Sequence, residues 1–120
     1  CYQAAFEKPI TVWSTAYDQK RPYLDIKDAS RALIHIINKN LFDGQTYNVL
    51  TDNSTVREVT DFIKEFCPNL EIEYVSNEIM NQLSYEVLNT RMEKSGFEAQ
   101  GDLVKGIKDT ISLLKQSRSC

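Results

Sequence analysis

Three short blocks of β-branched and aromatic residues along the chain predict strands. Residues 10–13 read Ile-Thr-Val-Trp and follow Pro9, and residues 45–50 follow a turn at Asp43 and Gly44. Residues 71–75 alternate between polar and apolar side chains with a period of two, which is typical of a half-buried strand.

Apolar residues at helical spacing predict a first helix that begins at Asp28 and ends at residues 38–40. Asp28 is expected to be its N-cap, because an aspartate side chain can accept a hydrogen bond from the first turn. Its apolar residues are expected to form one buried face, namely Ala29, Ala32, Leu33, Ile36 and Ile37.

A second helix is predicted to begin at Thr55 and to stop before Pro68. Thr55 and Glu58 have the spacing of a capping box, in which the side chain of each residue bonds the backbone of the other. The buried face of this helix is expected to hold Val59, Phe62, Ile63, Phe66 and Cys67.

The last third of the chain predicts two more helices. Thr90 and Glu93 repeat the capping-box pattern and predict a short helix that Gly96 terminates. Asp102 is expected to cap the final helix, before a frayed tail at residues 115–120. Residues 77–88 are expected to be helical in part. The buried side of the final helix is expected to hold Leu103, Ile107, Thr110, Ile111 and Leu114.

About four helices and three short strands, interleaved and without repeats or linkers, predict one small mixed α/β domain over residues 1–120. The net charge of −3 argues against nucleic acid as a partner, because such a surface needs basic residues on one face. No apolar run approaches the roughly 20 residues that cross a bilayer, so no membrane partner is expected.

The cysteines and glycines argue against several kinds of site. Cys1, Cys67 and Cys120 have neither zinc-site nor disulfide-framework spacing, so reduced thiols and a cytoplasmic location are expected. With His35 as the only histidine, we expect no metal site. The glycines lack the spacing of a dinucleotide-binding or Walker loop, so we expect the chain itself to hold no cofactor. Its start without methionine, inside a structured segment, suggests a piece of a longer protein.

Tyr23 and Lys27 have the spacing of a catalytic tyrosine–lysine pair. Such a pair must share one helix face, so that the ammonium lowers the tyrosine pKa, and Pro22 could begin a helix over residues 22–39. Against this, residues 23–26 alternate like a strand, and no glycine-rich loop precedes them. We interpret the pair as chance spacing across a strand end and a helix start, and expect no catalytic residue in this chain.

Arg21 lies between a polar loop and a strand-like segment. Its guanidinium could clamp a phosphate or carboxylate with two hydrogen bonds, or it could pair with Asp25 or Asp28 at the surface. Trp13 and Tyr17 flank the same loop and could offer a flat surface to a base or sugar, or could be packing residues. The local sequence leaves these alternatives open.

Several segments match one pattern in order along the chain. Residues 19–29 (QKRPYLDIKDA) are similar to Q-x-R-x-[FY]-x-x-V-x-D-[VAL], and an aliphatic helix follows. Residues 46–49 (TYNV) are similar to an "fNvg" strand, and residues 54–59 (STVREV) to the helix start after it. Residues 89–97 and 101–107 fit a closing pattern with a basic residue, a glycine–aromatic pair and L-x-x-G-I. Together they resemble the C-terminal substrate-binding part of the extended short-chain dehydrogenases, the NAD-dependent nucleotide-sugar epimerases and dehydratases.

This resemblance implies the C-terminal lobe of such an enzyme without its Rossmann domain, and it implies roles for individual residues. Arg21 would contact the diphosphate or ribose of a nucleotide sugar. Val12 and Trp13, on a strand that resembles the one leading into the family's nucleotide loop, would lie near the base. Gln19 would line the same cleft, and Arg91 stands near a position where relatives carry a basic residue.

Two features depart from the family. Ser14 stands where the family often has glycine, and the family's glycine-rich loop, catalytic Ser/Thr and Tyr-x-x-x-Lys lie N-terminal to the matched region. The resemblance therefore implies a parent enzyme whose missing Rossmann domain binds NAD. An exposed apolar patch is expected where that domain would pack, and self-association into a homo-oligomer could cover it.

The expected function is the nucleotide-sugar-binding portion of an NAD-dependent epimerase or dehydratase that acts through transient hydride transfer. Two alternatives stay open. One is a stand-alone, non-catalytic interaction module on the same scaffold, and the other is a reductase relative that acts on a non-nucleotide carbonyl.

Overall fold

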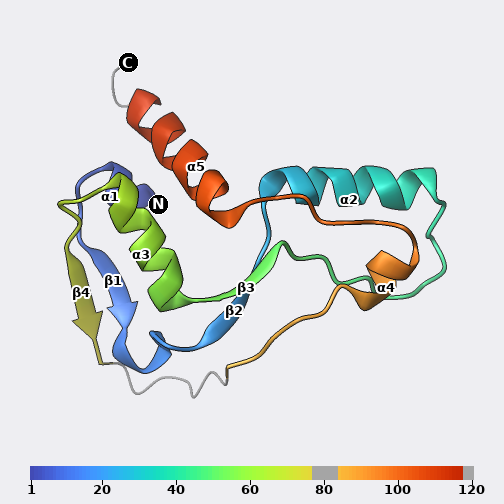
Figure 1. Cartoon of the computed structure of the whole chain (residues 1–120), viewed down its shortest axis with the longest axis horizontal. Helices are drawn as coiled ribbons and strands as arrows, with labels where there is room; N and C mark the ends of the chain where they lie inside the picture. The colour runs from blue at the N-terminus through green and yellow to red at the C-terminus, as the bar shows by residue number, and fades with distance from the viewer. Residues whose placement is uncertain (77–83, 118–120) are drawn as a thin grey trace.

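Residues 1–76 and 84–117 are described by the computed structural model, in which short strands and helices alternate (Figure 1). In chain order the elements are α1 (Tyr2–Ala5), β1 (Ile10–Trp13), the 3-10 turn η1 (Ser14–Ala16), β2 (Lys20–Tyr23), α2 (Ile26–Asn38), β3 (Asp52–Thr55), α3 (Val56–Phe66), β4 (Ile72–Val75), α4 (Thr90–Lys94) and α5 (Leu103–Ser117). The chain is therefore a small α/β domain, as the sequence predicts, and α1 is an addition to the expected helices.

The parallel pair β1–β4 supports the larger of two hydrophobic cores. Ile10 lies opposite Ile72 and Trp13 opposite Val75, at the positions that the sequence predicts for strands. The buried core residues come from α1, β1, α3 with its C-cap, and α5, and they are Ala4, Ala5, Ile10, Val12, Ile63, Cys67, Ile107 and Ile111. The buried faces predicted for α3 and α5 are confirmed, except that Thr110 is exposed and bonds the carbonyl of Gly106.

The antiparallel pair β2–β3 corrects the predicted strand at residues 45–50. Lys20 pairs with Thr55 and Tyr23 with Asp52, so the strand lies further along the chain than expected. Residues 45–50 have a strand-like composition, but within the described chain no strand lies beside them to supply hydrogen bonds. A side chain replaces the missing strand at Leu50. The amide of Asn89 bonds both the N–H and the carbonyl of Leu50, at 2.9 and 2.7 Å.

The start of α2 differs from the prediction by one turn. Asp25, and not Asp28, is the N-cap, because its Oδ1 accepts a hydrogen bond of 2.7 Å from the backbone N–H of Lys27. Asp28 is fully buried inside the first turn. Its carboxylate accepts hydrogen bonds from the Thr51 hydroxyl (2.8 Å), the Arg31 guanidinium (2.9 Å), and the backbone N–H groups of Gln100 (3.0 Å) and Gly101 (2.9 Å).

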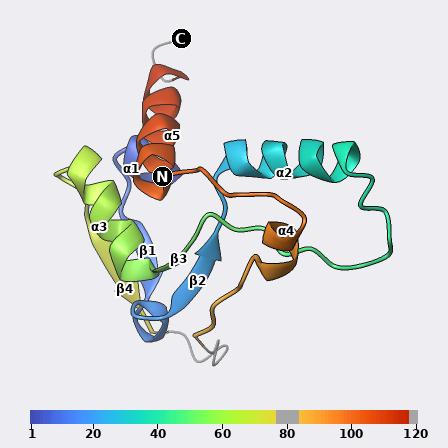
Figure 2. The same ribbon diagram turned by 45° about the vertical axis from the view of Figure 1, so that its right-hand side comes forward.

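The second core holds only part of the apolar face predicted for α2. Ala32 is buried with Met92 and Phe97, and residues such as Ile36 and Tyr47 pack around them. Leu33 and Ile37, which were expected in the core, are 63% and 64% exposed. The prediction is wrong there because α4 and the turn after it cover only one side of α2 (Figures 1 and 2).

The remaining helix ends confirm some predictions and correct others. The capping box of Thr55 and Glu58 is present. Thr90 does not form one, because Asn89 is the N-cap of α4 and makes no side-chain cap bond. Gly96, with a φ of 90°, ends the turn after α4 as expected.

Asp102 confirms its predicted role at the start of α5, since its Oδ1 accepts from the N–H of Lys105 at 2.9 Å. The helix continues to Ser117, beyond the expected start of fraying. Of the segment expected to be helical in part, residues 84–88 are irregular and residues 77–83 lie outside the described part. No helix among the described residues is long and apolar enough to cross a membrane.

Candidate functional site

The carboxyl ends of the parallel strands provide the natural place for a ligand. β1 ends at Trp13 and β4 at Val75, and the chain continues from β1 through η1 into β2. Trp13 is 41% exposed at this end, whereas Val12 before it is buried in the core. In open α/β sheets, ligands bind outside the carboxyl ends of the strands. Trp13 is therefore available to a ligand, and the Val12 side chain acts by holding the strand in place.

Arg21 extends from β2 and is oriented by its own loop. Its Nη1 donates to the carbonyl of Lys20 at 2.8 Å, and its Nη2 donates to Oε1 of Gln19 at 2.6 Å. Gln19 is held in turn, because its Nε2 donates to the carbonyl of Thr15 at 3.0 Å. The two predicted site residues Gln19 and Arg21 are thus brought into direct contact, and the loop between β1 and β2 positions both.

The sequence also left open that Arg21 pairs with Asp25 or Asp28 at the surface. Both aspartates have other roles in the structure. Asp25 caps α2, and Asp28 is buried against Arg31. The guanidinium of Arg21 lies instead over the ring of Tyr85, 5.2 Å from its centroid. A cation over an aromatic face is stabilised by the ring quadrupole, so Tyr85 helps to fix the position of the charge.

Residues 84–87, which sequence reasoning did not assign to the site, form a rim along β2. The N–H of Lys20 donates to the hydroxyl of Ser84 at 3.0 Å, and the Lys20 ammonium pairs with Glu86. Asn53 on β3 bonds both the N–H and the carbonyl of Val87, at 3.0 and 2.9 Å. The only signal for this role in the sequence is the high content of hydrogen-bonding side chains in residues 81–86, which a loop shares.

The loop between β1 and β2 is tied to α3 through Arg57. The Arg57 backbone N–H donates to the carbonyl of Tyr17, and its guanidinium lies 4.4 Å from the Tyr17 ring centroid. Its Nε also donates to Asp18 at 2.7 Å, and this bond lowers the Asp18 pKa. Hydrogen bonds from Tyr74 and Thr60 lower the pKa of Tyr17. The Tyr17 ring thus packs against Arg57 and, edge-on, against Tyr74.

Arg91 lies away from the other predicted site residues. It is on α4, donates to the carbonyl of Thr46 at 2.5 Å, and lies over the ring of Tyr47. α4 and the β1–β4 pair stand on opposite sides of β2–β3 in both views (Figures 1 and 2). Its contacts therefore bind α4 to the segment before β3 and do not bring it to Arg21.

Tyr23 and Lys27 lie on different elements, β2 and α2, as expected from a chance spacing. The ammonium of Lys27 is 3.6 Å from the carboxylate of Asp109 on α5. Burial raises the pKa of Tyr23, although Arg21 opposes this shift. A catalytic phenolate needs the opposite shift, so the geometry gives no support to a catalytic pair.

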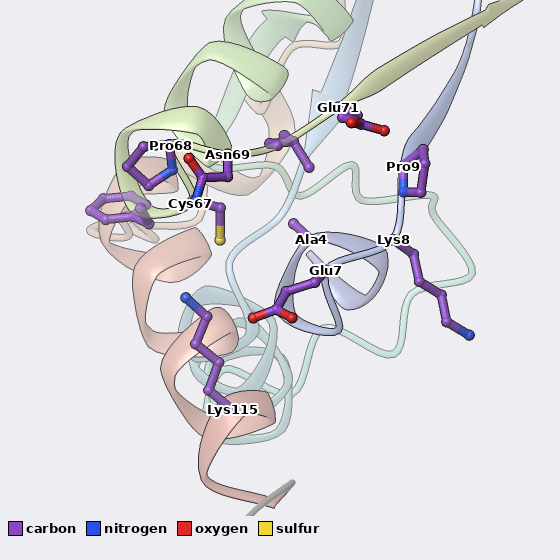
Figure 3. A pocket seen from close by; sticks show the side chains of 11 residues that line it. Ala4, Glu7, Lys8, Pro9, Cys67, Pro68, Asn69, Glu71 and Lys115 are labelled. Carbon is purple, nitrogen blue, oxygen red and sulfur yellow. The ribbon is translucent and has the colours of Figure 1, made fainter.

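A surface cavity of about 520 Å³ lies at the other end of the parallel strands, before β1 and β4 begin (Figure 3). Figure 3 shows the ends of the Glu7, Cys67 and Lys115 side chains turned toward this space. None of the predicted site residues lines the cavity. It is separate from the Arg21 site.

The N-termini of the longer helices carry their own capping side chains. A dinucleotide cofactor places its pyrophosphate against the free N-terminus of a helix behind a glycine-rich turn. Here Asp25, Thr55 and Asp102 fill the N-termini of the longer helices with their own side chains. The described part also contains no group of three or more metal-ligating His, Cys, Asp or Glu side chains.

No protein-family model matches the chain. Among solved structures, an L-threonine dehydrogenase from Phytophthora infestans matches 97% of this chain with a TM-score of 0.81 and 20% identity. A partial consensus L-threonine 3-dehydrogenase matches 96% with a TM-score of 0.78 and 23% identity. UDP-glucose 4-epimerase from Thermotoga maritima, solved with UDP-glucose, matches 98% with a TM-score of 0.79 and 17% identity.

The likeness shows the fold. The two L-threonine dehydrogenases and the UDP-glucose 4-epimerase contain the same α/β arrangement. The chain spans about 40% of their length, since it covers 39%, 40% and 38% of these three chains. At such identities the comparison extends to architecture and not to substrate.

Proposed function

We propose that this chain is the nucleotide-sugar-binding portion of an NAD-dependent epimerase or dehydratase. NAD, held by a domain outside these residues, would take a hydride from the sugar and return it. The residues of this chain would anchor the nucleotide diphosphate, with Arg21 beside the phosphates and Trp13 near the base.

The observation that carries this proposal is the orientation of Arg21. Gln19, the Lys20 carbonyl and Tyr85 contact its guanidinium and orient it. A guanidinium remains charged at any physiological pH and matches phosphate oxygens with paired donors. A pre-oriented cation loses little side-chain freedom when an anion binds, which favours a role in binding.

Proteins of similar fold support the choice of ligand. One epimerase was solved with UDP-glucose and another, from Stenotrophomonas maltophila, with NAD and formylated UDP-arabinopyranose. RMD from Pseudomonas aeruginosa was solved with NADPH. UDP-glucose is accordingly the first probe to use.

A second candidate is a dehydrogenase or reductase acting on a small, non-nucleotide substrate. It is favoured by the L-threonine dehydrogenases, which match this chain with TM-scores of 0.78 and 0.81 and with slightly higher identity than the epimerase. In that case Arg21 would face a carboxylate, for which a guanidinium is equally suited.

Isothermal titration calorimetry distinguishes the two candidate functions. It is carried out on the complete protein that contains this chain. We expect UDP-glucose to bind and Arg21→Ala to weaken binding by roughly 1.5–3 kcal/mol, the worth of hydrogen bonds to a charged group. Lys64→Ala is the matched control, because it removes an exposed cation on α3 that pairs with Asp61 in the same helix. Equal affinity in wild type and Arg21→Ala would remove Arg21 from the site. Binding of L-threonine without UDP-glucose would establish the second candidate.

A further inference from the structure

The start of α3 and the loop between β1 and β2 complete each other. The loop comprises residues 14–19 and passes beneath the start of α3 in both views (Figures 1 and 2). Arg57 is the second residue of α3, so its backbone N–H is one of the donors that have no partner within the helix. It donates to the carbonyl of Tyr17 at 2.9 Å. The helix thus fixes the backbone of the loop at Tyr17.

The side chain of Arg57 fixes the next residue of the loop. Its Nε and Nη2 each lie 2.7 Å from Oδ1 of Asp18, and its guanidinium lies 4.4 Å from the centroid of the Tyr17 ring. Two charge-assisted hydrogen bonds and an aromatic ring leave the guanidinium little freedom. Asp18 is therefore held in one position, although its side chain is 73% exposed. The three residues form a clamp on the loop.

The clamp ends one residue before Gln19, which contacts Arg21. The N–H of Gln19 donates to the carbonyl of Ala16 at 3.0 Å, inside the loop, and Oε1 of Gln19 accepts from Nη2 of Arg21 at 2.6 Å. Lys20, between these two residues, pairs in the β2–β3 ladder with Thr55, the N-cap of α3. The position of the Arg21 guanidinium therefore depends on the same helix end that holds Asp18.

The charge of Asp18 is unfavourable for a site that binds an anion. A carboxylate three residues from Arg21 repels a phosphate or carboxylate ligand, and pairing with Arg57 removes only part of this repulsion. An exposed ion pair also adds little to the stability of a fold. Neither attraction of the ligand nor stability thus explains an acidic residue at this position, whereas the closure of the loop does.

We propose that Asp18 and Arg57 are positioning residues of the Arg21 site. Their ion pair closes the loop at residues 14–19 and so sets the direction of the Arg21 guanidinium, and neither residue needs to touch the ligand. The inference rests on the proposed function to the extent that Arg21 binds an anion, and it holds for a diphosphate and for a carboxylate alike.

Asp18→Ala distinguishes positioning from charge, because the two predict effects of opposite sign. Loss of a nearby negative charge alone would strengthen the binding of UDP-glucose to the complete protein that contains this chain. Loss of the clamp should weaken it about two- to fivefold, the size expected for an exposed ion pair. Asp18→Asn keeps an acceptor for Arg57 and should lose less.

Asp61→Ala is the matched control for this titration. It removes an exposed carboxylate of the same charge, which pairs with Lys64 on α3 and not with the loop, and it should not weaken binding. An unchanged or higher affinity for UDP-glucose in Asp18→Ala, measured by calorimetry, would overturn the proposal.

A double-mutant cycle shows whether Asp18 acts through Arg21. If it does, Asp18→Ala should cost no further affinity in a protein that already carries Arg21→Ala. Equal fold-losses with and without Arg21 would give Asp18 an effect of its own on the ligand, which contradicts a positioning role.

Amide hydrogen exchange without ligand tests the clamp independently of the proposed function. The N–H groups of Gln19 and Arg57 both donate to loop carbonyls, and their protection factors should fall about two- to fivefold in Asp18→Ala. The amides of α5, which packs in the larger core, should be unchanged and show that the variant is folded. Unchanged protection of Gln19 and Arg57 would overturn the clamp whatever the ligand is.

The two kinds of failure are distinguishable. If UDP-glucose does not bind to the wild type, the proposed function fails, and the cycle is repeated with L-threonine, whose carboxylate would face Arg21 in the second candidate function. If UDP-glucose binds and the cycle is additive, the proposed function stands and the positioning role of Asp18 and Arg57 fails.

Discussion

The backbone N–H of Gly101 donates to the buried carboxylate of Asp28 at 2.9 Å, and the two residues are in such close contact that a side chain at position 101 has no room. A Cβ there would lie 2.6 Å from Oδ2 of Asp28 and 2.7 Å from Cβ of Asp25. This contact joins the first turn of α2 to the start of α5. Packing thus explains Asp28, the aspartate of the pattern at residues 19–29, and the need for glycine at position 101.

Gly101→Ala is expected to destabilise the protein by about 1–3 kcal/mol, the usual cost of overpacking. The matched control is Gly106→Ala on α5, where the Cβ would meet only the end of the Asp25 side chain, at 2.9 Å. That carboxylate can move, and alanine favours a helix over glycine by up to about 1 kcal/mol. Urea denaturation compares the two, and equal midpoints would contradict the packing account.

The buried carboxylate of Asp28 should make the free energy of unfolding depend on pH. Burial raises its pKa, but the hydrogen bonds from Gln100, Thr51 and Gly101 and the charge of Arg31 outweigh this and leave the pKa below the ordinary 3.8. A carboxyl group with a lowered folded-state pKa stabilises the protein above its unfolded pKa and loses this effect as the pH falls. The free energy of unfolding should therefore be constant near neutral pH and fall below about pH 4.

Asp28→Asn should reduce the stability at pH 7 by about 1.5–3 kcal/mol and flatten the acid limb, because hydrogen bonds to the charge are lost. Asp61→Asn, at an exposed carboxylate paired with Lys64, is the control and should leave the profile nearly unchanged. Denaturation curves between pH 3 and 7 provide the measurement. A steep acid limb that survives in Asp28→Asn would assign it to another group.

Two threonines with the same sequence pattern should behave differently. Thr55 accepts a hydrogen bond from the N–H of Glu58 at 3.1 Å, so Thr55→Ala is expected to cost about 1 kcal/mol. Thr90 lies inside the first turn of α4 and makes no cap bond, so Thr90→Ala should have little effect. Thermal unfolding of both variants checks this, and comparable losses would mean that α4 is capped by Thr90 in solution.

These threonines show what the sequence can predict and where it fails. Local rules located the start of α3 and the cap of α5, because their capping residues bond neighbours in the chain. They also located β1, whose β-branched composition is a strand signal, although its partner β4 is distant in sequence. They failed at Asp28, whose partners Gln100 and Gly101 are distant in sequence, and at residues 45–50, whose strand character needs a neighbour that the described chain lacks.

The candidate site was predictable in part for the same reason. Gln19 and Arg21 lie in one local signature and are in contact. Tyr85 reaches Arg21 across a long stretch of chain, and Arg91 turns out to hold the segment before β3. Neither placement follows from spacing, because each depends on how separate elements pack.

Tyr85 should contribute to ligand affinity through its ring and not its hydroxyl. Tyr85→Ala is expected to weaken UDP-glucose binding about two- to fivefold, which corresponds to roughly 0.5–1 kcal/mol for an exposed cation–π contact. Tyr85→Phe keeps the ring and should bind like the wild type. Calorimetric titration of both variants with UDP-glucose measures the two affinities. A loss of affinity in Tyr85→Phe as large as that in Tyr85→Ala would assign the effect to the hydroxyl.

The claim that Arg21 contacts the diphosphate is tested most directly by titrating wild type and Arg21→Ala with UDP-glucose, UMP and uridine. The account predicts that Arg21→Ala weakens UDP-glucose binding by about 10- to 150-fold, equivalent to roughly 1.5–3 kcal/mol, while the affinity for uridine stays the same. An equal loss for uridine and UDP-glucose, or no loss for either, would contradict it.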